Sequence, residues 1–180
     1  MICTISAQVI TDPLAFAVNI QGNNASKSYY KLELSINNDG VNDVLLARQE
    51  SQQEIAENKW LQEDGHIPFQ QNEHSFATFI GLKTGGYAFS DYIIVDLDQC
   101  YIGYIDEVKQ YGILTINYGE EGGSDKGYVY QKVICYTVSG NKIKKTGLTP
   151  RYALGDKNPI YDKYLSPSKR TQVQLQTVTP

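Results

Sequence analysis

Closely spaced acidic residues make residues 93–107, IIVDLDQCYIGYIDE, the first place in the chain to look for chemistry. Counted from Asp96, the residues Asp98 and Glu107 occupy positions 3 and 12 of an EF-hand-type calcium loop. Such a loop also needs an oxygen ligand at position 5 and a glycine at position 6, where this chain has a cysteine and Tyr101. The stretch therefore predicts two strands joined by a turn, and we expect neither a metal ion nor another cofactor.

The same two aspartates have the spacing of a catalytic pair. Alternate residues of a strand point to the same side, with Cα atoms about 7 Å apart, and paired carboxylates can act as acid and base on a sugar ring. A hydrolase that uses Asp96 and Asp98 is therefore one alternative. Nucleophilic catalysis would need a base, and the two histidines, His66 and His74, lie in a loop-like stretch without a catalytic signature. We expect both histidines to be solvated loop residues, and we expect the protein not to be an enzyme.

An acidic, glycine-rich segment offers a different kind of site. Residues 119–127, GEEGGSDKG, separate two predicted strands, and glycine lets such a loop protrude and change shape. We predict that this loop enters a cleft on a basic partner enzyme, as in an inhibitor or immunity-type protein. Complementary charge would speed the encounter, and tyrosine rings would anchor the complex. The expected partner-binding residues are Tyr118, Glu120, Glu121, Ser124, Asp125 and Tyr128.

Tyrosine is unusually frequent, with 14 residues among 180. Nine of them lie between Tyr87 and Tyr136, and tyrosine suits half-buried sheet surfaces because its ring packs while its hydroxyl reaches water or a partner. This pattern supports a second alternative, a carbohydrate-binding β module whose rings stack on sugars. An exposed row on one strand face, such as Tyr128, Tyr130 and Tyr136, would favour this alternative, whereas burial of those rings would exclude it.

Charge is divided unevenly along the chain, whose net charge is −4. Residues 1–130 contain 18 acidic and 7 basic residues, whereas residues 131–180 contain 9 basic residues and 2 aspartates. This division predicts either a basic tail that folds back on an acidic body or two faces that meet different partners. Because the chain is acidic as a whole and its basic segment is sparse, we do not expect it to bind nucleic acid.

The cysteines bear on the compartment. Cys3, Cys100 and Cys135 form no CxxC motif, which excludes a zinc ribbon and a thioredoxin-type site. Cys100 and Cys135 could pair in an exported protein or stay as buried thiols in a cytosolic one. The N-terminal residues lack a signal-peptide pattern, no window is apolar enough for a transmembrane helix, and Cys3 would carry a lipid anchor only in a trimmed lipoprotein. We expect a periplasmic or secreted protein, with the cytoplasm as the alternative.

These residues would be positioned by a mainly β domain, either an antiparallel β-sandwich or a twisted sheet. One short helix is expected near residues 50–62, where Gln, Glu and Ala accumulate. We expect one domain over residues 1–148 and an irregular, basic C-terminal tail over residues 149–180, packed on the domain or partly mobile. Alternating apolar residues and turn signals predict strands at residues 2–10, 14–20, 29–36, 75–83, 87–97, 99–105, 111–119, 127–138 and 141–147.

Overall fold

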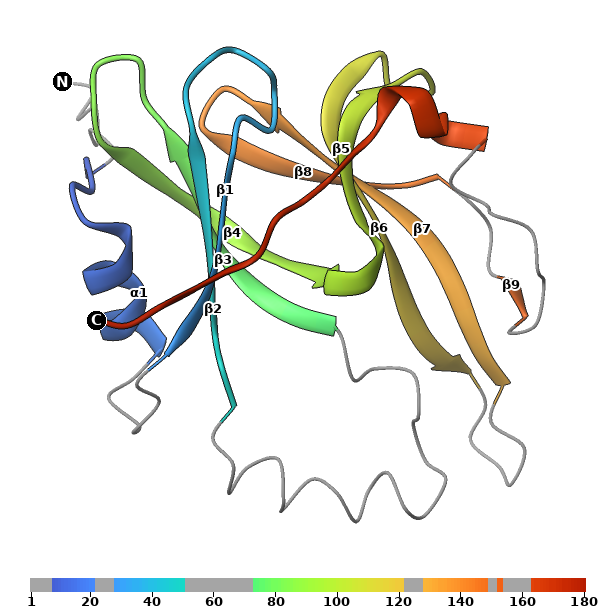
Figure 1. Ribbon diagram of the computed structural model, residues 1–180, viewed down its shortest axis with the longest axis horizontal. Helices are drawn as coiled ribbons and strands as arrows, with labels where there is room; N and C mark the ends of the chain where they lie inside the picture. Colours follow the sequence, from blue (N-terminus) through green and yellow to red (C-terminus); the bar gives the residue numbers. More distant parts are fainter. Residues whose placement is uncertain (1–7, 22–27, 51–72, 122–127, 149–151, 154–162) are drawn as a thin grey trace, which may run out of the picture.

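The computed structural model shows a mainly β protein built from two antiparallel sheets, as the sequence predicts (Figure 1). It describes residues 8–21, 28–50, 73–121, 128–148, 152–153 and 163–180. The helix expected at residues 50–62 lies outside these ranges, apart from its first residue.

The first sheet contains five strands in the order β11-β1-β2-β3-β4. Its first four strands in the chain form a simple meander, and the fifth comes from the C-terminal end. The strands are β1 (Tyr29–Leu34), β2 (Asp43–Arg48), β3 (Glu73–Gly81), β4 (Tyr87–Asp96) and β11 (Gln176–Val178).

The second sheet has the order β10-β5-β6-β7-β8, with β9 paired separately to β7. A single 3-10 turn, η1 (Leu97–Gln99), connects the last strand of the first meander to the first strand of the second. The strands are β5 (Cys100–Ile105), β6 (Gln110–Glu121), β7 (Tyr128–Ser139), β8 (Lys142–Gly147), β9 (Tyr152–Ala153) and β10 (Thr171–Gln172).

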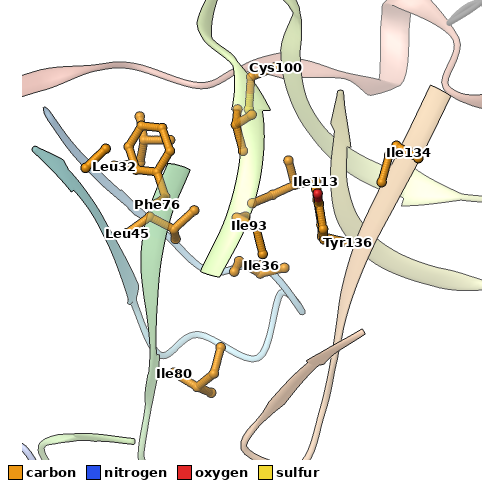
Figure 2. Close-up of a cluster of buried hydrophobic side chains, with 12 residues drawn as sticks. Leu32, Ile36, Leu45, Phe76, Ile80, Ile93, Cys100, Ile113, Ile134 and Tyr136 are labelled. Atoms are coloured by element: carbon orange, nitrogen blue, oxygen red, sulfur yellow. The ribbon is translucent and has the colours of Figure 1, made fainter. Parts of the chain in front are cut away.

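The main hydrophobic core lies between the inner faces of the two sheets (Figure 2). Strand β1 illustrates how the sequence builds it, because Leu32 is buried in this core while Lys31 and Glu33 face the other way. The first sheet also contributes Leu45, Phe76 and Ile93, and the second sheet contributes Ile113, Ile134 and Tyr136. The alternating pattern of β1 was therefore interpreted correctly from the sequence.

The outer face of the first sheet is covered by a helix, α1 (Pro13–Gln21), where the sequence had predicted a strand at residues 14–20. That prediction was wrong. The Asp12 carboxylate accepts hydrogen bonds from the backbone N–H groups of Leu14 and Ala15, each at 3.0 Å, and Pro13 occupies the first helical position. An aspartate cap followed by proline is a helix-start signal, and it prevails over the strand-like composition of the segment.

Aromatic stacking holds α1 to the sheet. The ring of Phe16 lies 5.8 Å from that of Phe79 and 5.8 Å from that of Phe89. Phe79 and Phe89 are themselves 5.6 Å apart, so the three rings form one cluster. Because helical residues on the sheet side meet an apolar surface, the short helix is stabilised by packing rather than by its own propensity.

The outer face of the second sheet has a smaller core covered by residues near the C-terminus. Leu114 and Cys135 of the sheet pack with Tyr164 and Leu165. Gly103 allows this close approach, because a Cβ atom at its position would lie 2.6 Å from a methyl carbon of Leu165. The C-terminal tail expected to be irregular thus contributes side chains to a core.

The C-terminal segment then crosses from one sheet to the other (Figure 1). Strand β10 pairs with the edge of β5, and β11 pairs with the edge of β1. Between them the N–H of Val173 donates to the carbonyl of Cys100 at 3.1 Å. We call residues 171–178 the strap. The strap covers the free backbone edges of both sheets on this side of the molecule.

On the opposite side, β4 forms the edge of the first sheet and no strand of the second sheet pairs with it. The side chain of Tyr136 in β7 forms hydrogen bonds with backbone groups of this edge. Its hydroxyl accepts a hydrogen bond from the N–H of Ile94 at 3.3 Å and donates one to the carbonyl of Ile94 at 3.2 Å. A side chain therefore takes the place of a neighbouring strand.

Two further hydroxyls act along the same edge. The N–H of Asp96 donates to Oγ1 of Thr115 at 3.0 Å, and the N–H of Ile143 in β8 donates to Oγ of Ser90 at 2.7 Å. We call Ser90, Thr115 and Tyr136 the hydroxyl seam. The seam joins β4 to β6, β7 and β8 without a continuous ladder of backbone hydrogen bonds.

Candidate functional site

The long hairpin β6–β7 carries the segment that the sequence marked for partner binding. Pairing of β6 with β5 ends at Thr115, and pairing of β7 with β8 ends at Ile134. The hairpin continues for six more residue pairs, from Ile116 opposite Val133 to Glu121 opposite Tyr128. We call residues 116–121 and 128–133 the arm. At about 3.4 Å per residue the arm extends the hairpin by roughly 20 Å.

Packing at its base sets the direction of the arm. Ile116 and Val133 are buried in the core on the outer face of the second sheet. The carbonyl of Val133 also accepts a hydrogen bond from the N–H of Leu148 at 2.9 Å, and β9 pairs with Tyr130 and Gln131 further along. The base of the arm is therefore held by packing and backbone pairing. Figure 1 shows that the arm extends from the second sheet in the direction opposite to the β7–β8 turn.

The expected site residues fall partly within the described region. Backbone pairing places Tyr118, Glu120, Glu121 and Tyr128 on the arm, opposite Gln131, Val129, Tyr128 and Glu121 respectively. Ser124 and Asp125 lie outside the described residues. The structure thus brings four of the six expected positions to the far part of one hairpin.

Charge is separated along this hairpin. Lys142 pairs with Ser139 at one end of β7, whereas Glu121 pairs with Tyr128 at the other end. Eleven residue steps along a strand correspond to about 36 Å, several times the Debye length of about 8 Å at physiological salt. The basic strand and the acidic arm are therefore too far apart to neutralise each other by direct contact.

The other lysines of β8 follow the same pattern. Lys144 and Lys145 are exposed, like Lys142, and none of the three ammonium groups forms an ion pair with a carboxylate among the residues that the structure describes. Lysines on an edge strand discourage pairing with another chain, which gives β8 a structural reason for its composition. Within the described residues, the positive charge of β8 is therefore not neutralised by ion pairs.

Asp96 and Asp98 lie in different environments and are not a matched pair of exposed carboxylates. Asp96 is buried, and its Oδ1 accepts hydrogen bonds from the N–H groups of Asp98 at 2.9 Å and Gln99 at 3.1 Å. It is the N-terminal cap of η1, while Asp98 is exposed. Within the described residues, no three His, Cys, Asp or Glu side chains are grouped closely enough to hold a metal ion.

The two described cysteines are free thiols on opposite faces of the second sheet. Cys100 lies in the core between the sheets, and Cys135 lies in the core on the outer face, so they do not form the disulfide that the sequence left open. Burial raises the pKa of Cys100 to about 12, with a smaller contribution from Asp96. Burial also raises the pKa of Cys135 to about 12, with a smaller contribution from Glu107. Neither thiol is activated as a nucleophile.

One of the two histidines was placed wrongly from the sequence. His74 lies in β3 rather than in a loop, is half-buried, and packs against Tyr30 with ring centroids 5.0 Å apart. Burial lowers the pKa of His74, while the charges of Glu50 and Asp96 oppose the shift. His66 lies outside the described residues.

The tyrosine row proposed for sugar binding loses one of its three members. Tyr136 is only 2% exposed and its hydroxyl belongs to the seam. A different pair was missed, because Tyr104 and Tyr111 are 40% and 39% exposed and their rings pack edge to face at 5.5 Å. They lie directly opposite each other where β5 turns into β6. Two tyrosines at equal distances from a turn, in YIDEVKQY, were the available signal.

No protein-family model, no curated protein and no solved structure matches this chain. Among the residues that the structure describes, no helix has the length and apolar character needed to cross a membrane.

Proposed function

We propose that this protein is a non-enzymatic binding module of the inhibitor or immunity type, which engages a basic partner enzyme through its acidic arm. The observation that carries the proposal is the register of β6 and β7, which continues six residue pairs beyond the last pairs with β5 and β8. An arm of this kind presents its far end to a cleft that a flat sheet surface could not enter.

Electrostatics supports the same function. The segment from Gly119 to Gly127 contains three carboxylates and one lysine. Because the lysines of β8 lie at the other end of the hairpin, the field of these carboxylates is not cancelled by β8. A basic partner would be attracted to the arm before contact, which raises the association rate.

The local roles of the alternative catalytic groups also favour a binding protein. The carboxylate of Asp96 caps a turn, and both described cysteines are buried with raised pKa values. A hydrolase built on Asp96 would have to give up two hydrogen bonds of that cap. These assignments give the alternative catalytic groups structural roles, and the acidic end of the arm is the binding feature that we propose.

Charge removal on the arm tests the proposal. The tagged protein is used to capture its partner from a lysate of the source organism, with elution in a salt gradient and identification by mass spectrometry. Binding of the purified partner is then compared for the unaltered protein and the Glu120→Gln, Glu121→Gln double variant. We expect at least a tenfold loss of affinity, mainly in the association rate, with an unchanged melting temperature.

The matched control is the Asp106→Asn, Glu107→Gln double variant. It removes two exposed charges from the β5–β6 turn, at the opposite end of β6 from the arm. Equal affinity of the arm variant and the unaltered protein would exclude the arm from the interface. Capture of no stoichiometric partner would contradict the proposal as a whole, and a glycan array would then test the exposed pair Tyr104 and Tyr111.

A further inference from the structure

A cavity of about 330 Å³ opens on the outer side of the first sheet, at the beginning of α1. Val44 and Leu46, which are almost fully buried, form its base, and Leu14 and Val178 contribute apolar walls. Small-molecule sites in proteins typically have volumes of about 300 to 1,000 Å³ with mostly apolar linings. The cavity, whose lining also includes Thr11, Asp12 and Lys31, therefore suits one small molecule with both polar and apolar parts and is too small for a dinucleotide or an oligosaccharide.

One cationic group lines this cavity. The ammonium of Lys31 donates a hydrogen bond to Oε2 of Glu33 at 2.6 Å, and Glu33 is not part of the lining. A lysine ammonium has three N–H donors. Lys31 thus retains donors for a carboxylate placed in the cavity, while the ion pair with Glu33 holds its side chain in position.

One anionic group lines the cavity as well. The Oδ1 atom of Asp12 caps α1 by accepting the N–H groups of Leu14 and Ala15. These amides are already satisfied by Asp12, so the start of the helix is not itself the binding group. The second carboxylate oxygen, Oδ2, forms no hydrogen bond with any residue in the described part of the chain. It remains able to accept a hydrogen bond from an ammonium group.

We infer that the cavity binds an apolar α-amino acid. The carboxylate of the ligand would be held by Lys31, its ammonium by Asp12, and its side chain by Val44 and Leu46. A ligand with only a carboxylate would be repelled by Asp12, and a ligand with only an ammonium would be repelled by Lys31. A zwitterion on an apolar frame satisfies both lining charges and the apolar base together.

The walls of the cavity give the inference a second consequence. Residues 11–14 precede or begin α1, whereas Val178 belongs to β11 in the strap. β11 is short and pairs with β1 over three residues. A ligand that contacts both walls connects the strap to α1, so its binding slows hydrogen exchange of the backbone amides of Gln176, Thr177 and Val178.

Three probes on the unaltered full chain test the inference by calorimetry. L-phenylalanine carries both charges, 3-phenylpropionate lacks the ammonium, and phenethylamine lacks the carboxylate. We expect L-phenylalanine to bind at least tenfold more tightly than either analogue, because each analogue loses one charge-assisted hydrogen bond and faces an unpaired lining charge. Hydrogen exchange of β11 should slow only with L-phenylalanine.

Two variants assign the groups. Lys31→Met keeps the apolar stem, and Asp12→Ser keeps a helix-capping side chain, so each removes one charge while the surrounding structure is retained. We expect each variant to bind L-phenylalanine at least tenfold more weakly. The control Lys83→Met removes an exposed lysine from the β3–β4 turn and should bind as the unaltered protein does.

Several results would overturn the inference. They are undetectable binding of L-phenylalanine, equal binding of either analogue, or unchanged binding by both charge variants. If a variant fails to fold, as judged by its circular dichroism, the comparison of the three probes on the unaltered protein still decides the matter.

Discussion

On one side of the sandwich, the edges of β1 and β5 are paired with the backbone of the strap, whereas on the other side the edge of β4 meets the hydroxyl seam. The strap uses main-chain groups that every residue except proline has, and most of its side chains are exposed. The seam depends on particular oxygen atoms of buried or half-buried side chains. In both places the backbone N–H and C=O groups of an edge strand need hydrogen-bond partners. The two ways of providing these partners place very different demands on the sequence.

The strap and the hydroxyl seam should therefore respond differently to mutation. A backbone ladder tolerates changes of side chain but fails when the chain is shortened. A seam of hydroxyls is sensitive to any substitution that removes an oxygen, because a partly buried backbone group would lose that hydrogen-bond partner. Three experiments separate these behaviours.

The largest effect is expected for Tyr136→Phe. The substitution keeps the ring in the core but leaves the N–H and the carbonyl of Ile94 without the hydroxyl that serves both. We expect the free energy of unfolding to fall by about 2 kcal/mol in urea titrations. Tyr104→Phe is the control, because Tyr104 is 40% exposed, and it should change stability by less than about 0.5 kcal/mol. Equal effects of the two variants would show that the seam contributes nothing.

An intermediate effect is expected when β11 is removed by deleting residues 175–180. The deletion removes the pairing of β11 with β1 and the packing of Val178 on the core beneath α1. We expect a loss of about 1 kcal/mol together with faster amide exchange in β1. Gln176→Ala, which alters only an exposed side chain, should stay within about 0.5 kcal/mol of the unaltered protein. If Gln176→Ala lowered the free energy of unfolding as much as the deletion does, side chains rather than backbone pairing would hold the strap.

The smallest effect is expected when the pH is changed. It concerns a buried carboxylate that accepts hydrogen bonds from backbone N–H groups, as the hydroxyls of the seam do. Asp43 accepts the backbone N–H groups of Ile36 and Gly81, each at 2.9 Å, and burial raises its pKa above the ordinary value of 3.8. Since the folded state then binds the proton more tightly, the stability of the unaltered protein relative to Asp43→Asn should be greatest below pH 3.8. The difference should decrease as the pH rises through the folded-state pKa.

Urea titrations of both proteins across the acidic range measure this difference. The cost of Tyr136→Phe should not vary over the same range, because tyrosine hydroxyls stay protonated at acidic pH. A stability difference between the unaltered protein and Asp43→Asn that increases with pH would contradict a raised pKa for Asp43. The two titration series therefore distinguish backbone contacts made by an ionisable carboxyl group from those made by a hydroxyl group.

Much of the fold could be predicted from local pattern. The strands from β3 to β8 follow alternating apolar and β-branched residues, and glycine-containing turns join β3 to β4 and β7 to β8. Gly140 adopts the left-handed conformation expected between β7 and β8. The failure at α1 has an equally local cause. Its residues are apolar without a helical spacing, and the cap formed by Asp12 and Pro13 was the signal to follow.

The candidate site could be predicted only in part. The acidic loop and its two strands are evident in the sequence, but the length of the arm depends on where β5 and β8 stop pairing. Tyr136 resembles Tyr128 and Tyr130 in the sequence, yet it is buried because the first sheet covers its end of β7. The lining of the cavity combines residues about 165 positions apart, Asp12 and Val178.

By itself, the sequence determined the class of fold, most of the strands of the two meanders, the acidic character of the hairpin tip and the absence of CxxC chemistry. These properties depend on neighbouring residues, whose alternation, turn propensity and charge act over a few positions. The tertiary structure alone decided the strap, the seam, the reach of the arm and the cavity beside α1. Each of these joins residues far apart in the chain, and such contacts form only where the packing of two whole sheets repays the entropy of closing long loops.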